Sequence, residues 1–586
     1  MYTNQEQEYD VVIMGAGFAG NCQARHLLLK NPELKIALID PRPEVRTNKD
    51  LKIGEATVEV SSMFLFRELG LYEYLIENHV PKQGLHFHWC KQPAKTDSFD
   101  DYYSLWNPLN PAIPSFQLER AKFERDLLKM NQDLGVIFYN GRVVDVDLAP
   151  GDEVNRVKVK LEGQESELQA KHLIDAAGRR FIIGRKTDNL IFDPEKLFNL
   201  KTGSAWMRIK NVDRTIFHDG YDPTGGVASH YYATNHFFGH GYWIWMLPID
   251  KQSQELSIGI VHHHDTISAK EINQKEKFSS FLQQNHSLLY RFIESGEAVD
   301  FHYLPRIAHT SKKILSEDNW YVIGDAAGML DPFYSTGMTW TAFTIETVTE
   351  VVLAKLAGEK DAEEKRSAFN QFNLKNLRNA NRLYYQHSKH LGHASIMSHR
   401  IYLEYMHWFG IVIPMYAGKW HLSTKFIAAF AKTHSLQTKI ILEIYDQLSQ
   451  LVDSDSNIGL MNFYRNNQLL GNYFPLKKFD GFLDGSKFDP QRNNFFASIK
   501  MTYFYLAIWY AQLQWKGFGL SGLCHPKQLL RFCQLLFFSS RFAIAELIYK
   551  HKTKNQPDNR EIAQLDEDFK TYRYQPQIQP WVESNG

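Results

Sequence analysis

A short glycine-rich turn near the N-terminus restricts the fold of this chain more than any other feature. Residues 11–14 form a continuous apolar run, residues 15–20 are Gly-Ala-Gly-Phe-Ala-Gly, and a helical pattern extends to about residue 30. A second apolar run over residues 34–39 ends at Asp40. This strand–helix–strand spacing predicts a Rossmann-type nucleotide-binding unit built on a parallel sheet.

Each glycine of this turn has its own physical role. Gly15 permits the tight turn, Gly17 lets the backbone approach a pyrophosphate, and Gly20 allows the helix to pack closely on the strand. The helix N-terminus supplies free N–H groups to that pyrophosphate, and Asp40 is placed to bind a ribose hydroxyl. A glycine-rich turn without a ligand is the alternative interpretation.

Two later segments have the pattern of strand ends that return to the same sheet. Residues 175–179 are Asp-Ala-Ala-Gly-Arg, and Gly324-Asp325 follows the apolar run 320–323. An Asp at such a strand end suits a ribityl hydroxyl. Contacts this dispersed fit a large, extended cofactor, and we find no second strand–GxGxxG–helix unit, so the sequence predicts FAD rather than NAD.

The turn Ser335, Thr336 and Gly337 follows in the same segment. Its backbone N–H groups can point at a small anion or at a flavin carbonyl. For a small anion such as a halide, donors of this kind replace a full opposite charge, so Ser335, Thr336 and Gly337 are a candidate anion site.

Length and composition limit the remaining possibilities. A chain of 586 residues exceeds one ordinary core. Lys and Arg together number 66, as do Asp and Glu, so no net field of the whole chain favours nucleic acid or an anionic membrane. Four cysteines without metal-site spacing fit a cytoplasmic protein. We expect no signal peptide and no transmembrane segment, because no apolar run approaches the roughly 20 residues that a spanning helix needs.

The patterns along the chain divide it into three parts. We predict an FAD-binding domain from residues 1–200 and 311–358, a β-rich substrate domain from residues 201–310, and a helical C-terminal domain from residues 359–586. Helices are expected at 424–434, 437–452, 501–515 and 529–548, among others. The aromatic content of the last two suggests helical core, with a grip for a lipid or a carrier arm as the alternative.

Several motifs resemble a known family. The glycine turn, residues 175–180 (DAAGRR) and residues 324–328 (GDAAG) resemble the aromatic-hydroxylase branch of FAD monooxygenases. Residues 243–248, Trp-Ile-Trp-Met-Leu-Pro, match the W-x-W-x-[IL]-P signature of the flavin-dependent halogenases.

Two further segments support this resemblance. Pro332, Ser335 and Gly337 match the family's F-x-x-P-x-x-S-x-G signature, with Met329 where Phe is usual, and residues 52–56 resemble its K-x-G-E segment beside the flavin. The chain is therefore similar to the flavin-dependent halogenases, in particular the branch acting on phenolic, pyrrolic or carrier-bound substrates.

The resemblance implies an α/β fold like that of p-hydroxybenzoate hydroxylase (PHBH), with a Rossmann-type FAD-binding domain, an inserted β-rich substrate domain and an α-helical C-terminal domain. In that family a separate flavin reductase supplies FADH₂, which reacts with O₂ to a hydroperoxide. A halide, chloride or bromide, attacks it to give hypohalous acid, which travels through a tunnel to a lysine near the substrate. The substrates belong to secondary metabolism, either as free small molecules or tethered to a carrier protein.

The resemblance also implies the residues that contact the flavin. They are Gly15, Gly17, Phe18, Ala19, Gly20, Asp40, Gly54, Glu55, Ala56, Arg120, Val144, Gly178, Gly324, Asp325, Pro332, Gly337 and Met338. For Arg120, a charge on a helix surface is the alternative.

Lys82 resembles the active-site lysine of related halogenases, because it precedes the alternating strand pattern of residues 85–89. Burial would lower its pKa and give a nucleophilic amine, or leave a hydrogen-bond donor to the oxidant. A solvated lysine at a strand end is the alternative.

Trp243 and Trp245 alternate on a predicted strand, so both indoles face one side. They would wall the passage and keep the substrate from the flavin, or simply pack in a core.

One departure from the family pattern affects the substrate. Tryptophan-specific members carry Glu just before the Ser of the second signature, where this chain has Tyr334. This argues against free tryptophan and leaves Glu55, His86 and His88 as candidates for a general base. Residues 262–264 are three consecutive histidines, but adjacent strand side chains point to opposite faces, so no metal site is expected.

Two rival functions remain open from the sequence. The first is an FAD-dependent monooxygenase or oxidoreductase that uses the flavin directly and adds no halogen. The second is a flavin- or lipid-binding protein without turnover.

Overall fold

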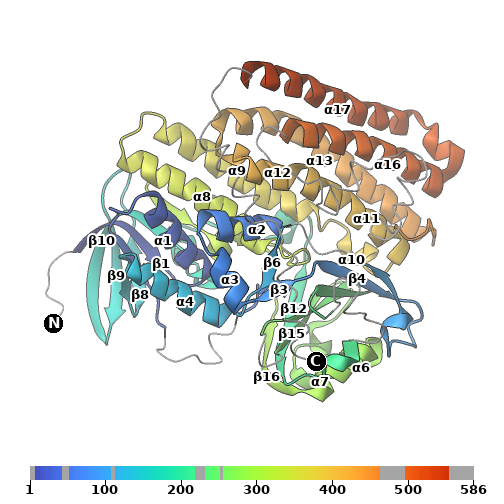
Figure 1. Ribbon diagram of the computed structural model, residues 1–586, viewed down its shortest axis with the longest axis horizontal. Helices are drawn as coiled ribbons and strands as arrows, with labels where there is room; N and C mark the ends of the chain where they lie inside the picture. The colour runs from blue at the N-terminus through green and yellow to red at the C-terminus, as the bar shows by residue number, and fades with distance from the viewer. Residues whose placement is uncertain are drawn as a thin grey trace.

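The computed structural model describes residues 7–42, 52–106, 113–217, 231–250, 255–461 and 495–553. Two β-sheet units lie side by side beneath a layer of long helices (Figure 1). This mixed α/β architecture with a helical C-terminal region agrees with the predicted fold class.

The first sheet has seven strands, with the order β7-β2-β1-β10-β9-β8 and β18 paired to β10. Its strands are β1 (Gln7–Met14), β2 (Ile36–Ile39), β7 (Ile137–Tyr139), β8 (Gly141–Asp147), β9 (Asn155–Leu161), β10 (Gln164–Asp175) and β18 (Trp320–Val322). β1 pairs in parallel with β2 and β10, and β10 pairs in parallel with β18. Carboxyl ends of parallel strands meet at one edge, so the turns that follow β1, β10 and β18 lie together there.

Helices cover this sheet and carry the segments around its edge. They are α1 (Phe18–Lys30), α2 (Glu59–Met63), α3 (Tyr72–Asn78), α4 (Arg120–Asp133), α5 (Ile182–Lys186) and α8 (Gly337–Leu356). Residues 11–14 of β1, together with β2 and β18, are buried on both faces, which explains their continuous apolar sequences, whereas β8 and β9 alternate between buried and exposed residues.

The second sheet also has seven strands, in the order β16-β12-β15-β14-β13-β4-β5. They are β4 (Leu85–Cys90), β5 (Tyr102–Leu105), β12 (Thr202–Lys210), β13 (Thr234–Gly239), β14 (Tyr242–Pro248), β15 (Leu256–His263) and β16 (Glu297–Leu304). β4 and β5 come from the part of the chain that sequence analysis assigned to the first unit. The structure also adds α6 (Lys275–Asn285) and α7 (Ser287–Ser295), which the prediction of a β-rich middle did not include.

Two small sheets link these units. β3 (Val80–Lys82) pairs with β6 (Ser115–Gln117), and β17 (His309–Ser311) lies between β11 (Leu190–Ile191) and β19 (Gly328–Met329).

The helical layer begins at α9. Its helices are α9 (Ala362–Arg382), α10 (His387–His390), α11 (Ala394–His407), α12 (Ile413–Ala417), α13 (Thr424–Asp453), α16 (Phe495–Leu523) and α17 (Pro526–Thr553). The two helices predicted at 424–434 and 437–452 are one continuous helix, α13. Ser435 and Leu436 between them do not stop a helix, since neither is Gly nor Pro.

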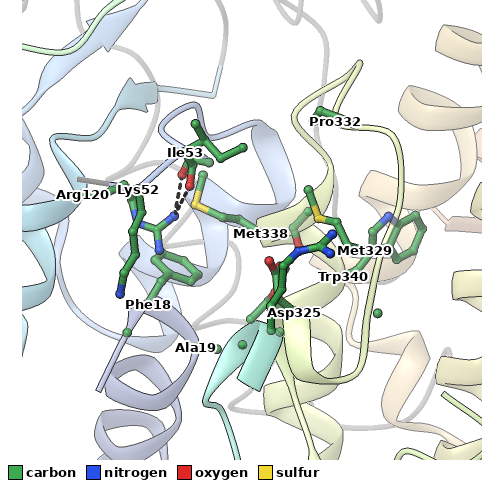
Figure 2. Close-up of a pocket in the computed structure, with 18 of the residues that line it drawn as sticks. Phe18, Ala19, Lys52, Ile53, Arg120, Asp325, Met329, Pro332, Met338 and Trp340 are labelled. Carbon is green, nitrogen blue, oxygen red and sulfur yellow. Dashed lines mark hydrogen bonds between the residues drawn. The ribbon is translucent and has the colours of Figure 1, made fainter. Parts of the chain in front are cut away.

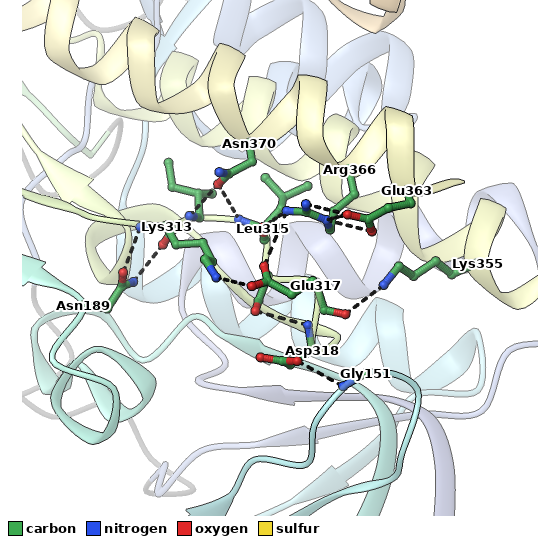
Figure 3. A network of polar contacts seen from close by, with 12 residues as sticks. Gly151, Asn189, Lys313, Leu315, Glu317, Asp318, Lys355, Glu363, Arg366 and Asn370 are labelled. Atoms are coloured by element: carbon green, nitrogen blue, oxygen red, sulfur yellow. Dashed lines mark hydrogen bonds and ion pairs between the residues drawn. The ribbon is translucent and has the colours of Figure 1, made fainter. Parts of the chain in front are cut away.

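A polar network anchors α9 to the segment that leads into β18 (Figure 3). The Asn370 Oδ1 accepts hydrogen bonds from the backbone N–H groups of Ile314 (2.9 Å) and Leu315 (3.0 Å). Arg366 donates to the carbonyl of Leu315 (2.9 Å) and pairs with Glu363. One side chain therefore satisfies two buried amides between the nucleotide-binding unit and the helical layer.

We expect Asn370→Ala to lower the free energy of unfolding by about 1–3 kcal/mol, because it leaves buried N–H groups unpaired. Lys313→Ala is the matched control in the same network. Its ion pair with Glu317 (2.7 Å) is partly exposed, so its loss should cost no more than about 0.5 kcal/mol. Chemical denaturation measures both. Equal effects of the two variants would show that the paired amides contribute nothing special.

Candidate active site

A cavity of about 620 Å³ opens where the parallel strands of the first sheet end. Figure 2 shows Phe18 and Arg120 on one wall, Asp325 and Met329 on the facing wall, and Met338 between them. The second sheet closes one side with Trp243 and Trp245 of β14. The glycine turn, the segment around Gly54 and the segment around Gly324 thus meet at one site, although they are far apart in the sequence.

The glycine turn is packed as a nucleotide-binding turn requires. Gly15 has φ +107°, and a methyl group there would lie 2.5 Å from the carbonyl oxygen of Ala176. A methyl group on Gly20 would lie 1.8 Å from the carbonyl oxygen of Gly15. At Gly17, by contrast, the nearest atoms would be 3.8 Å away. Space is therefore kept over the N-terminus of α1, where a pyrophosphate can accept from free N–H groups.

Glu124 of α4 organises this helix N-terminus, and the sequence analysis gave it no role. Its carboxylate accepts from the backbone N–H of Phe18 (3.1 Å) and from Arg42, Lys52 and Arg120. Burial would raise the pKa of Glu124, but these three cations outweigh it and lower the pKa to about 2. The spacing of Arg120 and Glu124, four residues apart on one helix, was the available signal.

Arg120 also contacts the K-x-G-E segment, residues 52–55, in the wall of the cavity. Arg120 donates to the carbonyls of Ile53 (3.1 Å) and Gly54 (2.9 Å), and its guanidinium lies 5.3 Å from the ring centre of Phe18 (Figure 2). Arg120 is therefore an integral part of the cavity wall, which argues against a simple surface charge.

Asp40 and Asp325 lie where a ribose and a ribityl chain would need acceptors. Asp40 lines the cavity and accepts from the backbone N–H of Ala16 (2.8 Å). Asp325 lines the cavity at the start of the segment after β18. Burial lowers the pKa of Arg179, and the nearby Asp325 carboxylate opposes that change.

Polar atoms in the wall also fit a large polar cofactor. Within the described residues, five cavity-lining side chains have a buried polar atom without a partner: Arg120 Nε, Ser204 Oγ, Trp206 Nε1, Asp331 Oδ2 and Trp340 Nε1. Buried polar groups are nearly always paired. An extended cofactor with many acceptors and donors, such as FAD, fits these atoms and the glycine turn.

The candidate halide turn lies at the N-terminus of α8. Ser335, Thr336 and Gly337 all line the cavity, and Ser335 is held by a hydrogen bond from its N–H to the carbonyl of Pro332 (2.9 Å). No atom lies within 4 Å of a methyl group built on Gly337. The first N–H groups of a long helix have no partners within the helix, so this turn offers anion-binding donors next to open space.

The two tryptophans of β14 are held by polar partners. Trp243 Nε1 donates to Asp331 Oδ1 (3.1 Å) and Trp245 Nε1 donates to Ser257 Oγ (3.2 Å). Their ring centres are 5.9 Å apart. Both line the cavity on the same side, so the prediction that they face one way agrees with the structure.

Asp331 is a second residue to which the sequence analysis assigned no role. It is buried beside the halide turn, and its Oδ1 also accepts from the N–H of Phe333 (3.1 Å). Burial raises the pKa of Asp331 to about 7, against the lowering effect of these two hydrogen bonds. The raised pKa favours the neutral carboxyl, and in that form Asp331 does not repel a halide at this turn.

This pKa makes the free energy of unfolding depend on pH. The pKa of Asp331 is about 7 in the folded protein against the ordinary value of 3.8, so the folded state binds an extra proton between these values. Stability at this group is therefore highest in acid and is lost as pH rises towards about 7, by up to about 4 kcal/mol.

We expect Asp331→Asn to remove this dependence, so the variant gains stability relative to the parent between about pH 5 and about pH 8. Urea denaturation at both pH values measures it. The exposed Asp145→Asn serves as control and should show no such gain. Parallel pH curves for parent and Asp331→Asn would contradict the prediction.

Lys82 is buried but is not among the residues that line the cavity. Its Nζ donates to the carbonyl of Thr57 (2.8 Å). Burial lowers the pKa of Lys82 to about 7, with Glu59 opposing. His236 does line the cavity, and the Lys82 charge adds to the burial that lowers the pKa of His236 to about 3.

The three candidate general bases differ in their hydrogen-bond partners and in whether they line the cavity. Glu55 lines the cavity but pairs with Arg208 (2.9 Å), and burial raises its pKa while Arg208 lowers it. His88 contacts Ser104 (2.9 Å) and Asn235 (3.0 Å) through its two ring nitrogens. His86 is buried on the same strand. Glu55 is therefore the only one of the three that lines the cavity, and its proton affinity depends on Arg208.

Tyr334, which stands where tryptophan-specific members have Glu, is buried and donates to the carboxylate of Glu404 from α11. The acidic group next to position 334 is therefore Glu404 of the helical layer, and not residue 334 itself.

Most of the predicted flavin-contacting residues line the cavity. The exceptions are Gly20, which packs against the turn itself, and Val144. The Val144 side chain is exposed, and its neighbour Val143 lines the cavity in its place, because successive strand side chains point to opposite faces. Within the described residues, no group of three or more His, Cys, Asp and Glu side chains could hold a metal ion.

Comparison with known proteins agrees with this geometry. A family model described as tryptophan halogenase matches residues 100–394. The chain is 40% identical over 603 aligned residues to the flavin-dependent halogenase chlA of Dictyostelium discoideum, covering 99% of this chain and 100% of that protein. It is also 25% identical over 350 residues to a 1H-pyrrole-2-carbonyl-(peptidyl-carrier protein) chlorinase of Pseudomonas fluorescens, covering 57% of this chain and 73% of that protein.

Among solved structures, halogenase PltM has the same fold, with a TM-score of 0.58, 15% identity and 98% of both chains covered. A triple mutant of the brominase Bmp2 gives a TM-score of 0.51 at 21% identity over 66% of this chain and 89% of that one. The family model and a 40% identical relative of nearly equal extent together show that this chain belongs to the flavin-dependent halogenases, FAD-dependent enzymes that use O₂ and a halide.

Proposed function

We propose that this enzyme chlorinates or brominates an electron-rich organic substrate that binds near Lys82, outside the flavin cavity. The observation that carries the proposal is the separation of Lys82 from the cavity. His236, which lines the cavity, contacts Phe333 (5.3 Å between ring centres), and Phe87 of β4 packs on both rings. A substrate at the lysine would be kept from the cofactor by this aromatic wall.

Each part of the site has a distinct task in this proposal. The cofactor, bound as FADH₂, would supply the chemistry that converts O₂ and a halide into hypohalous acid. The acid would then leave the cofactor cavity. The glycine turn, Arg120, Asp40 and Asp325 hold and orient the cofactor. Gly337 and the N–H groups beside it seat the halide.

Lys82 directs the oxidant towards the substrate. Its low pKa leaves an N–H donor, and a neutral amine for part of the population near pH 7. Trp243 and Trp245 exclude organic molecules from the halide turn. Glu55 remains the candidate base, with Arg208 holding its carboxylate in place.

The substrate class rests on the relatives and on Tyr334. One relative is named for a carrier-bound pyrrole, and halogenase PltM has been solved in complex with phloroglucinol and FAD. Position 334 lacks the Glu of tryptophan-specific members. We therefore propose a phenol or a pyrrole, free or carrier-tethered, of secondary metabolism.

A separate flavin reductase would supply FADH₂, because the described residues contain one glycine-turn cavity and no second unit of that kind for a nicotinamide. We also propose a cytoplasmic location, since the cysteines are unpaired and Cys524 and Cys533 are exposed.

One experiment tests the proposed reaction. The purified enzyme is incubated with a flavin reductase, NADH, bromide and a panel of phenols, pyrroles and indoles. Mass spectra are then searched for the bromine isotope doublet. Brominated phenols or pyrroles are expected, and products that contain oxygen but no halogen would favour the monooxygenase alternative. Consumption of NADH by the enzyme without the reductase would contradict the need for that partner.

A further inference from the structure

The helix α17 lies at the outer edge of the helical layer (Figure 1), and it has exposed apolar side chains along its length. Eight of the 14 large apolar side chains that are exposed within the described residues belong to α16 and α17. On α17, Leu530, Phe537, Ile544 and Leu547 recur at helical spacing, with exposed fractions of 64% for Phe537 and 68% for Leu547. A contiguous apolar surface of this kind marks an interaction site.

The exposed charged side chains of α17 are all basic. Its only acidic residue, Glu546, is buried and bonded to Lys500 and Lys550 (2.6 Å each). Arg541 and Lys552 form no ion pair with any residue that the structure describes. They lie on the same flank of the helix, three full turns apart. The partner of this face must therefore accept apolar side chains and carry negative charge.

The inner face of α17 is fixed to the protein. Arg531 is bonded to Glu443 of α13 (2.7 Å), and Phe542 stacks on Tyr503 of α16 (5.8 Å between ring centres). α17 is the one described helix that is long and apolar enough to cross a membrane, and only 28% of its most apolar stretch is buried. If α17 crossed a membrane, its contacts with Glu443 and Tyr503 would have to break. If α17 lay flat on a membrane surface, both contacts would be kept.

We propose that α17 docks the enzyme on an anionic lipid surface, with its axis in the membrane plane and Phe537, Ile544 and Leu547 inserted among the lipids. Apolar insertion and attraction of basic side chains to anionic headgroups act together in such helices. Cytoplasmic leaflets carry anionic lipids, so the proposal is compatible with a cytoplasmic enzyme. It goes beyond halogenation and does not depend on the site assignments above.

Vesicle cosedimentation of the full chain tests this. Vesicles of phosphatidylcholine and phosphatidylglycerol in a two-to-one ratio are compared with phosphatidylcholine alone. We expect the mixed vesicles to bind the protein, less at high salt. The double variant Phe537→Glu, Ile544→Glu should bind at least tenfold more weakly, and Arg541→Glu should lose part of the preference for the anionic vesicles.

The matched control places Glu at two exposed apolar positions elsewhere, Leu29→Glu with Ile137→Glu, and should bind like the parent. Absence of binding by the parent, or equal binding by the α17 double variant, overturns the proposal. So does a dimer in solution that the double variant abolishes, since a second copy would then occupy the face. Binding by a chain ending at Thr553, but not by the full chain, also overturns it, because residues 554–586 rather than lipid would then be the occupant of this face.

Discussion

Lys82→Met should abolish halogenation while leaving flavin binding unchanged. Methionine fills the same buried volume but provides no N–H and no charge, so the change removes chemistry rather than packing. If Lys82 directs the oxidant, the rate of product formation should fall at least about 1000-fold, in the range seen when an essential group is lost. Product is measured by mass spectrometry, and FAD affinity by fluorescence titration.

Lys52→Met provides the comparison. Lys52 lines the flavin cavity and bonds Glu124 (3.3 Å), but its side chain is largely exposed. We expect this variant to weaken FAD binding modestly and to keep the halogenation activity at saturating flavin. A Lys82→Met enzyme that still halogenates near the parent rate would remove Lys82 from the mechanism.

Gly17→Ala should abolish retention of FAD without unfolding the protein. Gly17 has φ −75°, which alanine adopts readily, and no protein atom would lie closer than 3.8 Å to the new methyl group. A bound pyrophosphate would meet that methyl group at the helix N-terminus, where the backbone must come close. We expect at least a 100-fold weaker affinity for FAD, about 2.7 kcal/mol, with the melting temperature of the cofactor-free protein unchanged.

Gly20→Ala separates binding from folding in the same turn. Its methyl group would lie 1.8 Å from the carbonyl oxygen of Gly15, so this variant should lower the melting temperature even without cofactor. A Gly17→Ala protein that binds FAD as well as the parent would show that the pyrophosphate lies elsewhere.

The local parts of the site were accessible from the sequence because short motifs determine them. The glycine turn fixes its own geometry through backbone contacts, and the Trp243 and Trp245 alternation follows from the strand period of two. Lys82 was found through its resemblance to a family lysine, and the structure shows the burial that this role requires. Its roles and those of the other site residues stay predictions until tested.

The remaining parts depend on contacts between distant segments. Glu124 looked like one charge of a surface helix, and only tertiary packing brings Arg42 and Lys52 to it. Burial in the folded protein raises the pKa of Asp331, and a hydrogen bond from Trp243, 88 residues away, opposes that rise. β4 joins the second sheet by pairing in parallel with β13, and no local pattern reveals which sheet a single strand enters.

The bond from Lys82 to the carbonyl of Thr57 has a consequence for the timing of catalysis. Thr57 follows directly after the segment whose carbonyls at Ile53 and Gly54 are gripped by Arg120 in the cofactor cavity. Because only a few residues of backbone separate these bonds, we expect a shift of that segment on cofactor binding to move the Thr57 carbonyl and with it the Lys82 amine. If Lys82 directs the oxidant as proposed, occupancy of the cofactor cavity would then set the position of that amine.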